Sequence, residues 1–391
     1  MTRRDVVITG IGLVSSLGEG PEAHWAALNN GAKPVVDAAS FAPFPVHPLP
    51  ALSLDAQIPK KGDQRQMEPW QRLGTYAAGL AIDHAGARGL VSDMHLVVAA
   101  GGGERDVAVD EAVTAALTSA APEASGALLN EKLATELRPT LFLAQLSNLL
   151  AGNISIVHGV TGSSRTLMGE EEAAADAIRI AAARLAEGRG EIALVGGAFA
   201  SQRWDMVLLY APGGVLWQGD YAPISARGDA GGLMLGAMAA FLVLETAEHA
   251  QARGAKALAR IGAIASDAAH QRAGGGSATA AAALWQGMAG SSAGLGVISG
   301  MTGVAEARIE EEAFLATLGS VPLRRSGSVL GHGVEASFPA NVALAALALS
   351  QNGFYPAMDP ADAGNGAVER ILVTGFGQWR GEALALLEKA P

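Results

Sequence analysis

Two short stretches near opposite ends of the chain share the pattern that decides the fold class: VVITGIG at Val6–Gly12 and ILVTGFG at Ile371–Gly377. Each is an apolar run that ends in Thr-Gly-apolar-Gly. Apolar runs of this length bounded by glycine are typical of buried β-strands. A duplicated α/β unit explains their similarity, with chance resemblance over so few residues as the alternative.

Further strand-like runs lie between these two and alternate with alanine-rich stretches of helical spacing. The strand-like runs are His95–Gly103, Ile192–Gly197, Ala240–Glu245 and Gly296–Gly300. The clearest helical stretches are Gln71–Ala87, Glu170–Glu187 and Asn341–Ser350. This alternation predicts parallel sheets covered by helices. The many alanines and glycines predict that helices pack closely on the sheets.

The length of the chain predicts two core units. It has 391 residues, whereas a single hydrophobic core usually stops growing at roughly 250–300. We expect two similar halves, residues 1–239 and residues 240–391. Residues 38–66 contain five prolines and the Lys60-Lys61 pair, which predicts a surface insertion in the first half.

Composition excludes several classes of protein. The chain has no cysteine, so it can form neither a disulfide scaffold nor a cysteine-based metal site. Half of its residues are hydrophobic and 17% are charged, which excludes an intrinsically disordered chain. Lys and Arg number 27 against 38 Asp and Glu, and the net charge of −11 disfavours nucleic acid and anionic membranes as partners. The eight histidines show no metal-ligand spacing, so we expect neither a metal nor another cofactor.

The sequence contains no clear targeting or membrane segment. The start MTRRDVVITG superficially resembles a signal peptide, but Asp5 and Gly10 interrupt it, which favours a buried strand. The most apolar later run, Leu233–Leu244, has 12 residues, whereas a membrane-spanning helix needs about 20. We therefore expect a soluble, cytoplasmic protein.

Two common enzyme signatures match poorly. The Gly10-Ile11-Gly12 turn could open a dinucleotide site, but Ser15 occupies the place of the third glycine. The stretch Gly290–Gly294 matches the serine-hydrolase elbow in letters, yet a helical stretch precedes it and a strand-like run follows it, the reverse of the required order.

The segment Gly159–Ala174, GVTGSSRTLMGEEEAA, is the most informative for chemistry. A glycine turn leads into a short strand, Arg165–Met168, which runs directly into a helix that begins with three glutamates. Free N–H groups and the positive end of the dipole lie at such a helix start, where enzymes place nucleophiles or bind anions. On the local pattern alone, glutamates that merely complement the dipole are the favoured interpretation.

At this point the sequence resembles the β-ketoacyl-acyl-carrier-protein synthases, condensing enzymes of the thiolase superfamily. The motifs are VVITGIGLVSSLG at the start, GVTGSSRTLMGEEE at the nucleophile turn, FLVLETAEHAQARGAKALARI after it, SVLGHGVEA, and VTGFG near the end. Their order covers nearly the whole chain. The resemblance implies a thiolase-like five-layered α/β/α/β/α sandwich of two duplicated halves.

The family carries out Claisen condensation, in which a cysteine accepts an acyl group from a carrier protein. Two histidines and a lysine assist decarboxylation and condensation. Counting from the Gly159 turn places the nucleophile position at Glu171, and counting back from Gly196-Gly197 gives the same residue. An acyl–glutamate product would be an anhydride that hydrolyses, so Glu171 cannot replace the cysteine in condensation.

The other family positions also depart from the pattern. The first histidine position falls at Ser299, or at Gly300 after a shift of one residue, and the lysine position falls at Gly327. The second histidine is retained as His332. The resemblance assigns Phe376 and Gly377 to substrate binding, through a gating ring and a backbone N–H. Further departures are Phe199, Ala237 and Gln378-Trp379-Arg380.

Loss of nucleophile, first histidine and lysine together resembles the chain-length-factor subunits of aromatic polyketide systems. This implies a condensation-incompetent subunit that forms a heterodimer with an active ketosynthase and shapes its acyl tunnel, with acyl carrier protein as a further partner; a homodimer is the other possibility. One alternative is a residual decarboxylase or thioester hydrolase, which requires Glu171 and His332 within about 3 Å of each other or of one shared water. Another is a binding module for an acyl chain or carrier protein, which requires a basic patch such as Lys60, Lys61, Arg65 and Arg72.

Overall fold

The computed structural model describes residues 3–101, 103, 105–139, 141–267, 275–288 and 290–390. The first half contributes strands β1 (Val6–Ser15), β2 (Gly18–Glu19), β3 (His95–Ala99), β4 (Ser164–Leu167), β5 (Ile192–Phe199) and β6 (Met238–Thr246). The second contributes β7 (Ala259–Asp267), β8 (Leu295–Ser299), β9 (Leu323–Arg325), β10 (Arg370–Phe376) and β11 (Glu382–Glu388).

The strand order shows that the fold is duplicated. The strands follow each other as β4-β3-β5-β6-β1 and then β7-β11-β10-β8-β9. The two-residue β2 pairs with β1 and lies off this order. With β2 left out, each half, counted from its own edge, runs third, second, fourth, fifth, first. The two five-stranded sheets meet where β1 pairs with β7, over Val7–Arg260 and Ile8–Ala259. The expected parallel pairing is present in both halves, where β3 pairs with β4 and β5 and β8 pairs with β9 and β10, whereas β6 and β11 run antiparallel to their neighbours.

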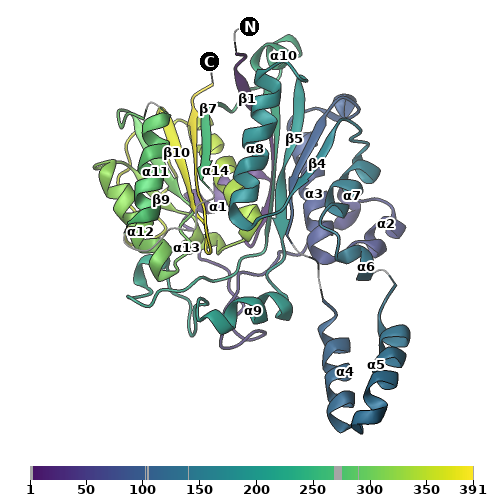
Figure 1. Ribbon diagram of the computed structural model, residues 1–391. Helices are drawn as coiled ribbons and strands as arrows, with labels where there is room; N and C mark the ends of the chain where they lie inside the picture. The colour runs from purple at the N-terminus through teal and green to yellow at the C-terminus, as the bar shows by residue number, and fades with distance from the viewer. Residues whose placement is uncertain are drawn as a thin grey trace.

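Helices complete five layers, as Figure 1 shows. In the first half, α3 (Pro69–His84) and α7 (Leu149–His158) cover the outer face of the sheet. In the second, α11 (Gly276–Gly287) and α12 (Ala305–Thr317) do the same. Between the sheets lie α8 (Glu170–Ala186) and α14 (Ser337–Ser350). The predicted α/β/α/β/α sandwich is confirmed.

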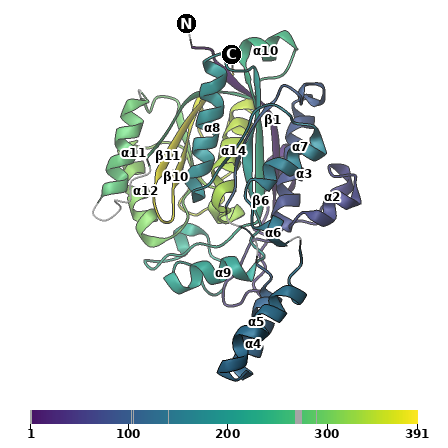
Figure 2. The same ribbon diagram turned by 45° about the vertical axis from the view of Figure 1, so that its right-hand side comes forward.

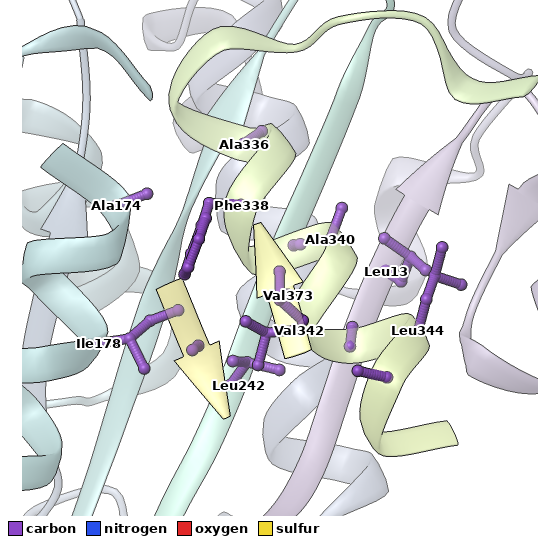
Figure 3. Packing of buried hydrophobic residues seen from close by; sticks show 14 of the residues in the cluster. Leu13, Ala174, Ile178, Leu242, Ala336, Phe338, Ala340, Val342, Leu344 and Val373 are labelled. Atoms are coloured by element: carbon purple, nitrogen blue, oxygen red, sulfur yellow. The ribbon is translucent and has the colours of Figure 1, made fainter. Parts of the chain in front are cut away.

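Three apolar clusters correspond to these layers. The largest lies between the sheets, where Ile178 of α8 and Phe338 of α14 pack with Leu242 of β6 and Val373 of β10 (Figure 3). The other two lie under the outer helices. Gly12 permits close packing in the first half, because a Cβ there would lie 1.9 Å from the carbonyl oxygen of Ala77 in α3.

The remaining helices are short or peripheral. They are α1 (Pro21–Asn29), α2 (Lys61–Gln66), α4 (Val107–Ser119), α5 (Pro122–Glu136), α6 (Leu141–Ala144), α9 (Trp204–Tyr210), α10 (Ala247–Ala252) and α13 (Gly327–Leu330). Helices α4 and α5 form a hairpin that projects away from the body of the protein in both views (Figures 1 and 2). In the part of the chain that the structure describes, no helix combines the length and apolarity needed to span a membrane.

Two predicted boundaries can be compared with these elements. Residue 239 lies inside β6, which the strand order assigns to the first half. We therefore propose that the halves divide between β6 and β7, within residues 247–258. Residues 38–66 are at the surface only in part, because His47 and Ile58 are fully buried while Lys60 and Lys61 are exposed.

Candidate active site at the start of helix α8

The turn from β4 into α8 places Glu171 in the first turn of a buried helix. Gly169 precedes the helix with a φ of 139°, in the region that favours glycine. This conformation lets the chain leave the strand at Leu167 and start the helix at Glu170. The side chain of Glu171 points inward and is 8% exposed. It therefore lies near the free N–H groups and the positive end of the helix dipole.

Glu171 is held by two donors from the second half. His332 Nε2 lies 2.9 Å from Glu171 Oε1, and the backbone N–H of Gln378 donates to the same oxygen over 3.0 Å. Burial alone would raise the pKa of Glu171, but the hydrogen bond and charge interaction with His332, together with backbone N–H donors, outweigh it and lower the pKa. Because the carboxylate accepts, the proton of this hydrogen bond lies on His332 Nε2.

The backbone fixes His332 in this position. Its N–H donates to the carbonyl oxygen of Met234 over 2.7 Å, and its carbonyl oxygen accepts from Gly236 over 2.8 Å. These bonds tie the His332 segment to the stretch that leads into β6. The predicted catalytic pair therefore comes together from α8 and from the segment between α13 and α14.

Gly377 lies against the carboxylate at the turn between β10 and β11. A Cβ at this position would lie 3.2 Å from Glu171 Oε2 and 2.2 Å from the carbonyl oxygen of Arg380, so the turn needs glycine. The N–H of Gly377 donates to the Gly381 carbonyl oxygen over 3.0 Å. Phe376 is buried and its ring lies 6.1 Å from that of Phe314. The structure thus brings both predicted substrate-binding residues to the site.

The cavity beside Glu171 and His332 is small. Its volume is about 10 Å³, and Gly300, Asn341, Phe376 and Gly377 also line it. A volume of this size holds roughly one water molecule. The Glu171 and His332 side chains therefore leave little free space at the predicted nucleophile position.

Ser299 does not join this site. Its hydroxyl donates to Glu311 Oε1 of α12 over 2.5 Å, and Thr374 donates to the same oxygen over 2.6 Å. Successive residues of a strand face opposite sides of the sheet, so Ser299 faces the outer layer while Gly300 lines the central cavity. The predicted site residue Ser299 therefore lies outside this cavity, and of the two registers left open by the sequence, the one at Gly300 lies beside His332.

The lost lysine position also lies nearby. Gly327 lines a second small cavity together with Gly300 and His332. Gly300, Gly327 and His332, the residues at three predicted family positions, thus line one cavity. Sequence reasoning missed Asn341, which lines both cavities, and the N–H of Gln378.

A second carboxylate near the site has an unusual pKa. Burial raises the pKa of Glu172 to about 7, helped by the negative charges of Asp176, Glu382 and Asp267 and opposed by Arg380. Among the described residues, no group of His, Asp and Glu side chains has the geometry of a metal site.

A larger hollow of about 600 Å³ opens beside Gly169. Its lining is mostly aromatic and apolar, with one buried ion pair. The lining includes Trp70, Met168, Phe199, Arg203, Asp205, Met206, Tyr210 and Trp379. The ring of Trp379 stacks on Tyr210 at a centroid distance of 6.3 Å, and the neighbouring Gln378 N–H binds Glu171. The stretch Gln378–Arg380, which differs from the family pattern, therefore lies between the hollow and Glu171.

Sequence comparison identifies the family. The sequence profile described as "Beta-ketoacyl synthase, N-terminal domain" matches residues 3–250. The chain belongs to the β-ketoacyl synthase family. The match ends just after β6, as expected if that strand closes the first half of this synthase fold.

Curated relatives are similar over part of their length. The 3-oxoacyl-[acyl-carrier-protein] synthase 2 of Vibrio harveyi is 30% identical over 271 residues, 67% of this chain and 62% of the relative. The tetracenomycin polyketide synthase ketoacyl synthase beta subunit of Streptomyces glaucescens is 30% identical over 265 residues, 64% of this chain and 60% of that protein. The similar regions thus span less than two thirds of these β-ketoacyl synthases.

Solved structures share the fold over the full chain. The ishigamide ketosynthase/chain length factor superposes with a TM-score of 0.81 at 21% identity and covers 100% of both chains. A type II polyketide ketosynthase in complex with its acyl-carrier protein, AntDE:AntF, gives a TM-score of 0.77 at 19% identity, again over 100% of both chains. These likenesses establish the β-ketoacyl synthase fold.

Proposed function

We propose that this chain is a condensation-incompetent β-ketoacyl synthase subunit that pairs with an active ketosynthase in fatty-acid or polyketide assembly. The observation that carries the proposal is the buried Glu171 carboxylate, which is bound to His332 at the helix start where the family places its cysteine. The chain contains no cysteine at all. A carboxylate at this point cannot hold an acyl group as a stable thioester.

The neighbouring positions support the same conclusion. Gly300 and Gly327 occupy the places where the family carries its first histidine and its lysine, and neither glycine has a side chain to move a proton or bind an enolate. His332 has the right chemistry, but Glu171 already accepts its Nε2 proton. The cavity has room for roughly one water, so an acyl thioester cannot enter without displacing these side chains.

An exposed sheet edge supports pairing with another subunit. Strand β4 pairs with β3 on one side and is the last strand of the sheet. Edge strands present N–H and C=O groups that can pair with another chain. Apolar side chains surround this edge, since Met168 is 65% and Ile156 is 72% exposed. Association at β4 would cover them.

The hollow of about 600 Å³ next to this edge supports a role in shaping an acyl tunnel. Its lining is largely apolar, as an acyl chain requires, and it begins at Gly169 directly before α8. A partner docked along β4 would close its open side. Two comparisons agree with a paired role: the Streptomyces glaucescens relative is named as a beta subunit, and the ishigamide structure holds a chain length factor with its ketosynthase.

Co-expression with candidate ketosynthases and their carrier protein tests this proposal. The expected result is a stable 1:1 complex that condenses malonyl and acyl units, with all turnover lost when the cysteine of the partner is replaced. The Glu171→Ala variant should reduce stability but leave condensation by the partner measurable. A strictly homodimeric chain with no effect on any ketosynthase would refute the proposal.

One observation favours a second candidate function. The 2.9 Å between Glu171 and His332 meets the distance required of an acid–base pair, which could decarboxylate malonyl-carrier protein or hydrolyse an acyl thioester. Purified chain incubated with labelled malonyl-carrier protein tests this. Release of CO₂ no faster than from a Glu171→Ala, His332→Ala double variant would eliminate it.

The basic patch required of a simple carrier-protein receptor is only partly available. Lys61 forms an ion pair with Asp55 at 2.5 Å, and Arg72 donates to the Gln64 carbonyl oxygen over 2.7 Å. Lys60 and Arg65 remain exposed. A receptor without chemistry is therefore the less favoured role for this chain.

A further inference from the structure

We propose that a groove at the junction of the two sheets binds an organic diphosphate, at a site separate from the candidate active site. The groove has a volume of about 400 Å³, within the range of small-molecule sites. It is lined by the second half of α8, by the residues that lead into β1, and by the start of β7. This inference goes beyond the function proposed above and does not depend on it.

The groove lies at the opposite end of α8 from Glu171. A helix rises about 1.5 Å per residue, so Ala186, the last residue of α8, lies roughly 22 Å along the axis from Glu171. The backbone N–H of Arg4 donates to the Ala186 carbonyl oxygen over 3.1 Å, which holds the start of the chain beside this helix end (Figure 1). A ligand in the groove would therefore not touch the Glu171 carboxylate.

Positive charge is concentrated in the groove. Among the described residues, four arginines line it together with a single acidic residue, Asp5, although the whole chain has a net charge of −11. The arginines come from three separate segments; they are Arg3, Arg4, Arg179 and Arg260. Guanidinium groups bind phosphate oxygens through paired N–H donors. Arginines on three segments that face one groove fit a ligand with more than one negative charge.

Carboxylates beside the groove orient two of these guanidinium groups. Arg4 Nη1 lies 2.5 Å from Glu191, and Arg179 donates to Asp176 from Nε over 2.9 Å and also from Nη2. The two arginine side chains are 39% and 43% exposed. A guanidinium group has more N–H donors than these bonds use. Both arginines can therefore still bind an anion while their ion pairs hold them in place.

Arg260 and Arg3 differ in how far their charges are neutralised. Arg260 on β7 lies 3.1 Å from Asp5 and also pairs with Glu388, so its charge is balanced within the protein. Arg3 is exposed and forms no hydrogen bond or ion pair with any other residue that the structure describes. Its charge is the least compensated of the four, and Arg3 therefore gains most from a bound anion.

The floor of the groove is apolar. Its side chains come from α8 and β7; they are Ala182, Ala183, Ala186, Ile261 and Ile264. The alanines leave room for a flat organic group to lie on this surface, and burial of such a group would add to the free energy of binding. Free phosphate has no part that could use the floor. The groove therefore fits a diphosphate attached to an organic group better than an inorganic anion.

Calorimetric titration of the purified chain with ADP, pyrophosphate and adenosine tests the proposal. ADP should bind at one site with a Kd below about 1 mM. Pyrophosphate should bind more weakly because it cannot contact the floor, and adenosine should not bind measurably because it offers nothing to the arginines. By mass action, saturating ADP should also raise the unfolding temperature of the chain.

Two arginine variants locate the site. Arg3→Ala and Arg179→Ala should each weaken ADP binding by about tenfold, the effect of losing a hydrogen bond to a charged group. Arg3 makes no contact that the fold needs, so its variant should unfold at the temperature of the parent. Arg65→Ala is the matched control, because Arg65 is an exposed arginine on α2 that does not line the groove. Its ADP affinity should stay within about twofold of the parent.

Three results would each overturn the proposal. The first is the absence of saturable ADP binding to the unmodified chain. The second is an equal loss of affinity in Arg65→Ala and Arg3→Ala, because binding would then depend on overall charge and not on this groove. The third is adenosine binding as tight as ADP binding, since the arginines would then contribute nothing.

Discussion

Nε2 of His332 and Oε1 of Glu171 lie 2.9 Å apart in a pocket that has space for little else. The contact crosses between the two halves of the fold, and each side chain satisfies the other. In the proposed function, His332 holds a carboxylate that cannot form the acyl intermediate.

Removal of the Glu171 carboxylate should destabilise the fold. Glu171→Ala leaves His332 Nε2 buried without its acceptor, which should lower the free energy of unfolding by about 2–4 kcal/mol. Glu171→Gln keeps a carbonyl oxygen for both donors and should cost about 1 kcal/mol. Urea unfolding of the free chain measures both. Equal losses in the two variants would show that the hydrogen bonds do not account for the effect.

Acid should affect the parent and the Gln variant differently. The pKa of Glu171 is lowered in the folded chain, so its contribution is complete above the unfolded carboxyl pKa of about 4.3 and is lost as the pH falls through the folded value. Below about pH 4, the parent should therefore lose stability more steeply than Glu171→Gln. Parallel unfolding curves down to pH 3 would contradict the lowered pKa.

Glu171→Cys alone should not restore condensation. The thiol would lie at the helix start, but Gly300 and Gly327 still lack the histidine and lysine. A histidine at position 300 would meet crowding, because its Cβ would lie 2.6 Å from the Thr374 carbonyl oxygen. Mass spectrometry of products from acyl- and malonyl-carrier protein is the measurement, with Glu171→Ser as the control for a small side chain. Condensation well above that control would mean that the family positions are misassigned.

Glu172 should make the fold less stable as the pH rises. Burial and neighbouring carboxylates raise its folded pKa to about 7, so the folded chain binds more protons than the unfolded chain between the two pKa values. Stability should therefore fall from about pH 4.5 to pH 7. At pH 8, Glu172→Gln should be more stable than the parent by about 1 kcal/mol, a figure reduced for solvent screening of this half-buried group. Thermal melts across this range test it, and a parent that is the more stable at pH 8 would contradict it.

The close approach of α3 to β1 should make Gly12 intolerant of a side chain. The Cβ of Gly12→Ala would lie 1.9 Å from the Ala77 carbonyl oxygen, and the forced backbone shift should cost about 1–3 kcal/mol. Gly89→Ala is the matched control, because nothing lies within 4 Å of its added Cβ. Denaturant midpoints for the pair measure the difference, and similar midpoints would show that the helix can move away.

The sequence correctly predicted a duplicated fold. However, the two similar stretches on which that prediction rested do not occupy equivalent strands of the two halves. Val6–Gly12 lies in the first strand of its half, whereas Ile371–Gly377 lies largely in the fourth strand of the other. The counterpart of β10 is β5. Both β1 and β10 are buried, and in both a glycine allows a neighbouring element to approach closely. Similar surroundings therefore favoured similar residues in the two strands. Strand order is a long-range property, and a local pattern cannot show it.

Sequence reasoning placed Glu171, His332 and Gly377 together because a family motif fixes each of them. It left Ser299 and Gly300 open for the first histidine position, because a shift of one residue reverses which face of a strand a side chain occupies. It also did not predict the hairpin of α4 and α5, whose alanine-rich helices lack the apolar periodicity of a buried element. Their position depends on ion pairs such as Arg138–Glu68, between residues 70 positions apart.

The narrow junction between the sheets gives the Glu171 contact a mechanical consequence. In the part of the chain that the structure describes, the sheets share the two pairs Val7–Arg260 and Ile8–Ala259. Glu171 belongs to one repeat, and its donors His332 and Gln378 belong to the other. Any rotation of one repeat against the other must stretch these bonds. Under the proposed function, a centre without condensing chemistry would thus still set how rigidly this subunit supports its neighbour.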